Sequence, residues 1–152
     1  MTATPVHPTA SPKRPRPEPD AVTQPFWEAV NRRELRIQRC EACEGWQHPP
    51  AARCHGCGAT TLSFQPVSGR ARLVSWTKAC QPLAPGFSAS VPYINLLVEL
   101  DEQAGLMMLS DSASCPLDEE ALHVGARMRL YFEEIAAGLL LPQFTLDAET
   151  AR

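Results

Sequence analysis

The sequence predicts a mainly β protein, with an N-terminal helix, a four-cysteine metal-binding ribbon and a C-terminal five-stranded barrel. Residues 40–57 contain two CxxC pairs, Cys40/Cys43 and Cys54/Cys57, with the spacing of a four-thiolate metal site. After Cys57, short strand-like segments separated by turn residues, with one small helix, favour a Greek-key barrel of the OB type. Periodicity alone equally permits another small barrel or a sandwich.

Length and composition fit this size of fold. The chain has 152 residues, enough for one ordinary domain or for a small module followed by a barrel. Its apolar fraction of 44% and its mean hydropathy of -0.20 are typical of a globular protein. No segment has the roughly 18–20 apolar residues of a membrane span, and the N-terminus lacks the apolar core of a signal peptide. We therefore expect a cytoplasmic protein, in which closely spaced cysteines favour metal over disulfides.

Charge is distributed unevenly between the two halves. Residues 1–58 contain 8 Lys/Arg and 6 Asp/Glu, a net charge of +2, whereas residues 59–152 contain 6 and 11, a net charge of -5. A surface that binds nucleic acid phosphates concentrates Lys and Arg. The barrel half is therefore poorly suited to nucleic acid.

The first 24 residues are predicted to form a tail. Six of the 15 prolines fall within the first 19 residues, so we expect this segment to be disordered or extended. The run Lys13-Arg14-Pro15-Arg16 could touch an acidic partner, but a solvated tail is the simpler interpretation. Pro25 suits the first turn of a short helix that ends at about Arg32, with Phe26 and Trp27 on its apolar face.

The remaining elements follow in order. Residues 35–38 alternate apolar and polar and predict a strand that leads into the first cysteine pair, and residues 46–49 predict its returning partner. The expected barrel strands are 71–78, 93–100, 106–109, 128–135 and 139–144, with a helical turn at 116–123. The predicted units are a tail (1–24), a helix with the ribbon (25–66), a barrel (67–146) and a C-terminal tail (147–152).

The four cysteines are the candidate metal ligands. Zinc is the expected ion, and iron in a rubredoxin-like site would use the same ligand set. Four protein ligands leave no open position for water, so we expect the metal to be structural. His48 and His55 lie close enough in the sequence to replace a ligand, but four cysteines already suffice.

No complete catalytic constellation is recognisable. Cys80 and Cys115 have no histidine in a recognisable motif beside them and are better interpreted as simple thiols. The adjacent carboxylate pairs have the pattern of ordinary solvated charge. The sequence has no GxGxxG, P-loop or GxSxG motif. We therefore expect no enzyme activity from this chain, although a stand-alone activity is not excluded.

Two other segments are candidates for binding. Arg32, Arg33, Arg36 and Arg39 follow the aromatic pair Phe26/Trp27. Such a surface could hold a phosphate-bearing nucleotide such as coenzyme A, or an acidic partner, and a solvated face is the commonest explanation. The interval 80–92 is a long proline-containing loop inside the barrel, and loops of this length are often functional.

The order of these features resembles a family long catalogued as domain of unknown function 35, over about residues 25–145. The resemblance rests on the four cysteines, Phe26-Trp27-Glu28, Leu35 to Gln38, Pro49-Pro50, Val67 to Ala71, Val91-Pro92-Tyr93, Val98 to Glu102, Gly125, Met128 to Glu134 and Leu141 to Phe144. It implies a helical segment, a rubredoxin-like zinc ribbon and an OB-fold barrel. This chain departs from the usual pattern at Glu44, where glycine is common, and in the longer turn Glu102 to Gly105.

The resemblance also implies a functional setting. Similar proteins are non-catalytic partners of thiolases, thiolase-like aldolases, related synthases or MaoC-type hydratases, and they help to bind or channel acyl-CoA in lipid metabolism. The expected contacts with CoA or a partner in this chain are Phe26, Trp27, Arg32, Arg33, Arg36, Phe87 and Tyr93. The rival hypothesis is a single-stranded nucleic-acid-binding module, since zinc ribbons and OB folds also occur there.

Overall fold

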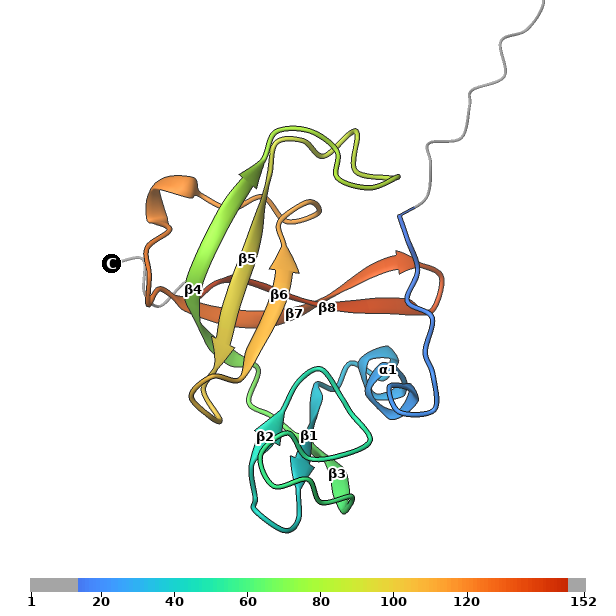
Figure 1. The fold of residues 1–152 in the computed structure, drawn as a ribbon. Helices are drawn as coiled ribbons and strands as arrows, with labels where there is room; N and C mark the ends of the chain where they lie inside the picture. Colours follow the sequence, from blue (N-terminus) through green and yellow to red (C-terminus); the bar gives the residue numbers. More distant parts are fainter. Residues whose placement is uncertain (1–13, 148–152) are drawn as a thin grey trace, which may run out of the picture.

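A computed structural model describes residues 14–147, so residues 1–13 of the predicted tail and residues 148–152 lie outside it. One helix, α1 (Gln24–Asn31), precedes a three-stranded sheet of β1 (Arg36–Cys40), β2 (Trp46–Gln47) and β3 (Leu62–Pro66). A five-stranded sheet follows, made of β4 (Arg70–Ala79), β5 (Tyr93–Leu100), β6 (Met107–Asp111), β7 (Arg127–Ala136) and β8 (Leu139–Leu146). The one-turn 3-10 helix η1 (Glu119–Ala121) precedes β7. The prediction of a mainly β protein with one N-terminal helix is confirmed, and Figure 1 shows the small sheet below the large one, with α1 beside both.

Helix α1 begins at Gln24, one residue before the predicted start. Pro25 lies in its first turn, and the side chain of Asp20 accepts hydrogen bonds from the backbone N–H groups of Val22 and Thr23 just before it. Its buried face consists of Phe26, Ala29 and Val30. None of the helices within residues 14–147 is long and apolar enough to cross a membrane.

The small sheet has β1 in its centre, antiparallel to both β2 and β3. Gln38 and Gln47, on the paired strands β1 and β2, are both buried. The amide of Gln47 donates to Oε1 of Gln38 at 2.6 Å. The side chain of Gln38 also donates to the carbonyl of Ala51 and accepts from its N–H. These two hydrogen bonds fix the loop between the two cysteine pairs.

The large sheet is antiparallel, in the order β6-β5-β4-β7-β8, and its long strand β4 pairs with β5 and, near its start, with β7. The two edge strands, β6 and β8, are joined by side chains. Ser110 donates from Oγ to Oε1 of Gln143 at 2.8 Å, and the N–H of Phe144 donates to the same serine oxygen at 2.8 Å. Ser110 and Gln143 therefore close the curved sheet.

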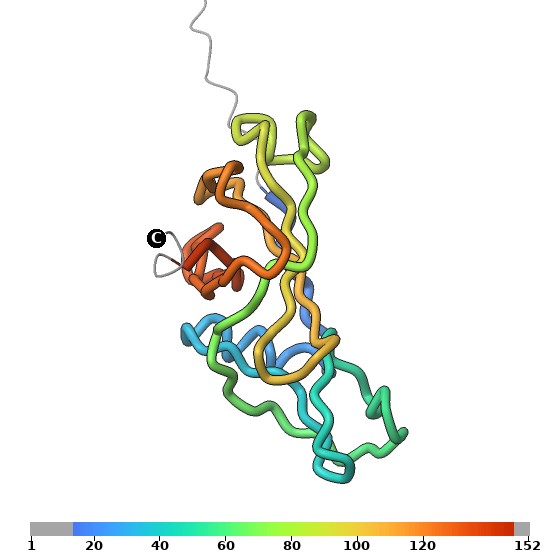
Figure 2. The backbone as a smooth tube through the Cα atoms, turned by 90° about the vertical axis from the view of Figure 1, so that its left-hand side faces the viewer, coloured from blue at the N-terminus to red at the C-terminus, as the bar shows by residue number. Residues whose placement is uncertain are grey.

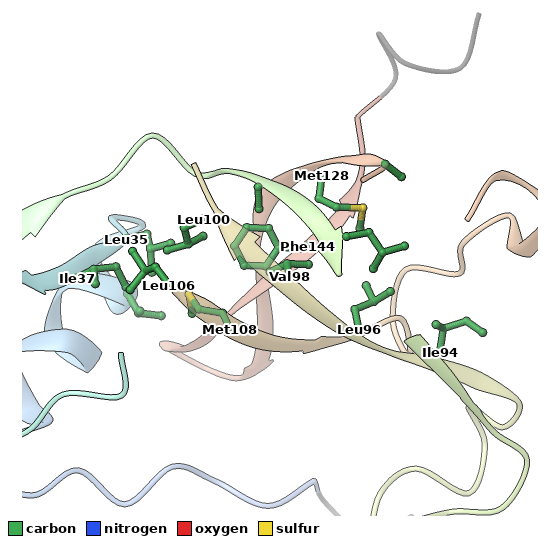
Figure 3. Packing of buried hydrophobic residues seen from close by; sticks show 14 of the residues in the cluster. Leu35, Ile37, Ile94, Leu96, Val98, Leu100, Leu106, Met108, Met128 and Phe144 are labelled. Carbon is green, nitrogen blue, oxygen red and sulfur yellow. The ribbon is translucent and has the colours of Figure 1, made fainter. Parts of the chain in front are cut away.

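The two sheets share one hydrophobic core. Leu35, just before β1, and Ile37, within β1, belong to the same buried cluster as Leu100 and Leu106 of the barrel (Figure 3). The side chain of Gln103, in the turn between β5 and β6, accepts from the N–H of Trp46 and donates to its carbonyl. The view in Figure 2, turned by 90°, also places the β5–β6 turn against the small sheet. This arrangement fixes the orientation of the metal-binding part against the barrel.

Candidate metal centre and adjoining pocket

The four cysteines converge at the tip of the small sheet. Their Sγ atoms all lie within 4.8 Å of one another, with 3.7 Å between Cys40 and Cys57 and 3.6 Å between Cys43 and Cys54. A tetrahedral ion with Zn–S bonds of about 2.3 Å requires sulfur atoms about 3.8 Å apart. The observed separations therefore fit a tetrahedral thiolate ion site.

Local backbone turns aim the sulfur atoms. The N–H of Cys40 donates to the carbonyl of Gly45, and the N–H of Cys54 donates to that of Ala59. The turns use left-handed backbone at Gly58, with φ of 76°, and at Glu44, with φ of 60°. Glu44 is the residue where glycine is common, so this departure places a side chain in a conformation that favours glycine.

The backbone also favours a thiolate at Cys54. The N–H groups of Cys57 and Gly56 lower the pKa of the Cys54 thiol to about 6. At Cys43 the N–H of Gly45 lowers the pKa, but the neighbouring thiols raise it, to about 12 overall. Four thiolates at these separations repel one another, so a cation between them stabilises the turns that hold them.

A pocket of about 440 Å³ lies where helix, ribbon and barrel meet. Its apolar walls are Phe26 and Trp27 of α1, Pro49 and Pro50 of the ribbon, and Met108, Leu109, Leu141 and Pro142 of the barrel. Polar atoms come from Thr23, Asn95, Ser110, Asp111 and Gln143. Leu109 remains 76% exposed at its rim. Ligand pockets in proteins are commonly about 300–1,000 Å³ and mostly apolar, and this one fits both criteria.

His48 completes the wall of this pocket beside Phe26. The two rings lie 5.4 Å apart, and the buried Nδ1 of His48 has no hydrogen-bond partner among the described residues. Burial lowers the pKa of His48 from its ordinary value of 6.5 to about 4. The imidazole is therefore neutral at pH 7, and His48 belongs to the pocket and not to the metal site.

Two functional residues were missed by sequence reasoning. Gln38 and Gln47 hold the loop that carries Pro49 and Pro50 into the pocket wall, because Gln47 accepts from the N–H of His55 and donates to the carbonyl of Arg53. Only the position of the two glutamines on short strands beside a cysteine pair could have indicated such a role.

The structure separates the aromatic and basic residues that the sequence grouped. Phe26 and Trp27 line the pocket, whereas no arginine is among its described lining residues. Arg32 and Arg33 are exposed directly after α1. Arg36 pairs with Glu34 at 2.7 Å, and Arg39 donates to the carbonyl of Glu44. The last two arginines therefore act within the ribbon and its approach.

Phe87 and Tyr93 contact each other, with ring centroids 5.1 Å apart. Tyr93 is buried, and the guanidinium of Arg14 lies 4.4 Å above the ring of Phe87. Neither aromatic residue is among those lining the pocket. Cys80 and Cys115 lie outside the four-cysteine group as free thiols.

Two family models match consecutive parts of the chain. Residues 27–63 match the rubredoxin-like zinc ribbon domain of ChsH2, and residues 64–133 match the C-terminal OB-fold domain of ChsH2. The sequence-based prediction of a zinc ribbon followed by an OB barrel is therefore confirmed. The four cysteines lie close together within the matched zinc ribbon domain, and because they can fill all four positions of a tetrahedral ion, the metal of such a site has a structural role.

Two curated proteins match most of the chain. It is 34% identical over 131 residues, 86% of its length, to the probable enoyl-CoA hydratase alpha subunit of Thermomonospora curvata. It is 33% identical over 102 residues, 62% of its length, to the 3-oxo-4,17-pregnadiene-20-carboxyl-CoA hydratase alpha subunit of Mycobacterium tuberculosis. These matches span only 39% and 31% of the two relatives.

Solved structures agree with this assignment. A chain of the Ltp2-ChsH2(DUF35) aldolase superposes with a TM-score of 0.73 at 30% identity, covering 86% of this chain and 98% of that one. A DUF35-family protein of unknown function from Sulfolobus solfataricus shares the fold, with a TM-score of 0.57 at 15% identity over 84% and 86% of the two chains. The chain therefore belongs to the ChsH2 (DUF35) family, in which a rubredoxin-like zinc ribbon precedes an OB-fold barrel.

Proposed function

We propose that this chain is a non-catalytic accessory subunit that binds an acyl-CoA-processing partner and helps to bind or channel its substrate. The partner is a thiolase-superfamily enzyme, such as an aldolase, or a MaoC-type hydratase. The observation that carries this proposal is the apolar pocket between α1, the ribbon loop and the barrel. An acyl chain needs an apolar, water-excluding environment, and this pocket of about 440 Å³ has mostly apolar walls.

The pocket suits the acyl part of the substrate better than the nucleotide part. Its described lining contains no Lys or Arg that would bind phosphates, and Asp111 adds negative charge. The CoA phosphates would therefore lie outside it. Arg32 and Arg33, exposed just beyond the helix that carries Phe26 and Trp27, are the basic groups available on that side.

The relatives support an acyl-CoA setting. Two are named as hydratase alpha subunits, and a third is a chain of the Ltp2-ChsH2(DUF35) aldolase. A protein named as a subunit acts together with another chain. Because the described lining of the pocket contains no nucleophile–base pair, we assign the chemistry to the partner and the pocket to this chain.

The pocket chemistry supports a binding role. Its titratable side chains are His48, which is neutral, and Asp111, which is bonded to Arg14. Neither forms a described nucleophile–base pair. The aromatic candidates for stacking bases under the rival hypothesis are Trp76, Tyr131 and Phe132, of which Trp76 and Phe132 pack against the core instead.

Co-expression tests the proposal. Thiolase-like and hydratase subunits encoded beside this chain would be produced alone and together with it, and their solubility, co-purification and acyl-CoA turnover measured. We expect one of them to co-purify with the chain and to gain activity. If every candidate is equally soluble and active alone, and none co-purifies, the accessory role is wrong.

A further inference from the structure

A second binding arrangement lies beside the pocket, at the first residue that the structure describes. One guanidinium nitrogen of Arg14 donates to both carboxylate oxygens of Asp111, at 3.2 and 3.1 Å. The other donates to Glu133 and, at 3.3 Å, to Oγ of Ser114. These partners come from the end of β6, the segment after it, and β7, so Arg14 bridges elements that are distant in the sequence.

An aromatic ring covers the guanidinium. Its central carbon lies 4.4 Å from the centroid of the Phe87 ring, which itself leans on Tyr93. A planar cation with donors in its plane and an aromatic ring on its face is the arrangement that guanidinium groups favour. Asp111, Ser114, Glu133 and Phe87 thus form a guanidinium site, with carboxylates at the edge and a ring on the face.

The site also accommodates the backbone that carries the cation. A Cβ added at Gly86 would lie 2.5 Å from the nitrogen and 2.8 Å from the Cα of Arg14. Only a glycine leaves space for the chain to pass here, and its φ of 85° is one that glycine adopts readily. The loop 80–92, whose length made it a candidate for binding, therefore contributes both Phe87 and Gly86 to this site.

Burial makes a cation necessary at this position. The side chains of Asp111 and Glu133 are only 17% and 8% exposed, and Gln143 donates to both of them. Two carboxylates held together away from water repel each other unless a positive charge lies between them. The site is complete only with a guanidinium or a similar cation bound.

The segment between Arg14 and α1 is largely exposed. Pro15, Arg16, Glu18 and Pro19, on the way to α1, are exposed, and Figure 1 shows the segment running past the β7–β8 end of the barrel towards α1. We propose that Phe87, Asp111, Ser114 and Glu133 form a binding site for the arginine of an extended, proline-flanked peptide, which residues 14–19 of this chain occupy. This inference does not depend on the proposed acyl-CoA function.

A peptide added in trans tests the site on the full chain. The probe is a fluorescein-labelled peptide of residues 11–19, titrated by anisotropy into the wild-type chain and into Arg14→Ala. Because the attached segment competes as a ligand of high local concentration, we expect the probe to bind Arg14→Ala at least about tenfold more tightly than wild type. Arg16→Ala is the matched control and should behave as wild type.

Peptide variants identify the recognised side chain. A probe with Arg14→Ala should not bind, whereas a probe with Arg16→Ala should bind as the unchanged peptide does. Equal binding to the wild-type and Arg14→Ala chains, absence of binding to both, or equal binding of the two altered peptides would overturn the proposal.

Two further measurements complete the design. Arg14→Lys keeps the positive charge in case Arg14→Ala does not fold, and it should bind the probe with intermediate affinity because lysine lacks the planar donors. Light scattering of the wild type identifies the source of the bound segment. A monomer means that each chain fills its own site, whereas a dimer that Arg14→Ala dissociates means that a second copy does. If the affinity of Arg14→Lys for the probe is no higher than that of wild type, the site does not recognise the guanidinium group.

Discussion

At the scale of single residues, the four cysteines are the groups whose role the sequence predicts best. Ligand identity follows from spacing alone, because two CxxC turns bring four sulfur atoms together whatever the rest of the fold does. Cys54 has the clearest thiolate character, since two backbone N–H groups lower its pKa to about 6.

Replacing Cys54 with serine should release the metal. A structural zinc site contributes on the order of 10 kcal/mol of apparent binding free energy to folding. We expect Cys54→Ser to lose bound zinc, to unfold the ribbon and to weaken association with the partner, as measured by metal analysis and thermal unfolding. Cys80→Ser, at an exposed free cysteine, is the control and should keep its zinc. A Cys54→Ser chain with full zinc content would contradict the four-cysteine site.

His48 predicts a pH dependence of stability. The folded chain holds its imidazole neutral, with a pKa of about 4 against an ordinary value of 6.5. The unfolded chain therefore takes up a proton first as pH falls, and stability present above pH 6.5 is lost progressively down to about pH 4. The full loss is about 3 kcal/mol.

Urea unfolding of wild type and His48→Leu at several pH values measures how much His48 contributes to the pH dependence of the free energy of unfolding. Loss of zinc at low pH affects both chains, so the difference between their pH slopes isolates His48. We expect the leucine variant to have the shallower slope, and His123→Gln, at an exposed histidine, to retain the wild-type slope. Equal slopes for wild type and His48→Leu would show that His48 is not held neutral.

Other single residues could not be predicted. The sequence placed Gln38 on a strand but did not reveal its hydrogen bonds, because in a three-stranded sheet this small, side-chain amides satisfy backbone groups that no further strand reaches. Arg14 was assigned to a disordered tail because its neighbours are prolines. Its contacts depend on Asp111 and Glu133, about a hundred residues away, which no local pattern reveals.

At the scale of elements, strand positions follow the sequence closely wherever both faces of a strand are constrained. The strand over 93–100 has the predicted bounds, and from Ile94 onward buried residues alternate with partly buried ones. The helix shifts by one residue, to Gln24–Asn31. The turn Glu102 to Gly105 was noted only as a departure from the family pattern, and the structure gives its Gln103 the role of bonding Trp46 of the ribbon.

Closure of the barrel depends on Gln143. Its Oε1 accepts from Ser110 and from the N–H of Asp111, and its amide donates to Asp111 and Glu133. Gln143→Leu leaves several of these buried groups without partners, so we expect the free energy of unfolding to fall by roughly 3 kcal/mol. Chemical denaturation measures the loss. Gln65→Leu, at an exposed glutamine on β3, is the control, and an equal effect of both changes would contradict side-chain closure.

At the scale of the whole molecule, ribbon, helix and barrel form one unit. The sequence predicted each part, but not that Leu35 and Ile37 would join the barrel core, since packing between parts leaves no signal in spacing. That shared core and the Gln103 contact hold α1 and the Pro49-Pro50 loop against the barrel. The pocket exists because of this placement, so the zinc acts on the proposed function by shaping a binding surface.

The most direct test of this account measures acyl-CoA turnover by the assembled complex. We expect Trp27→Ala to raise KM for a long-chain or ring-bearing acyl-CoA at least about tenfold, since truncating a large pocket side chain costs about 1.5–3 kcal/mol, and to leave KM for acetyl-CoA unchanged. Leu83→Ala, at an exposed loop residue outside the pocket lining, should match wild type for both substrates. If Trp27→Ala assembles normally and has the wild-type KM for every acyl-CoA, the pocket does not receive the acyl group.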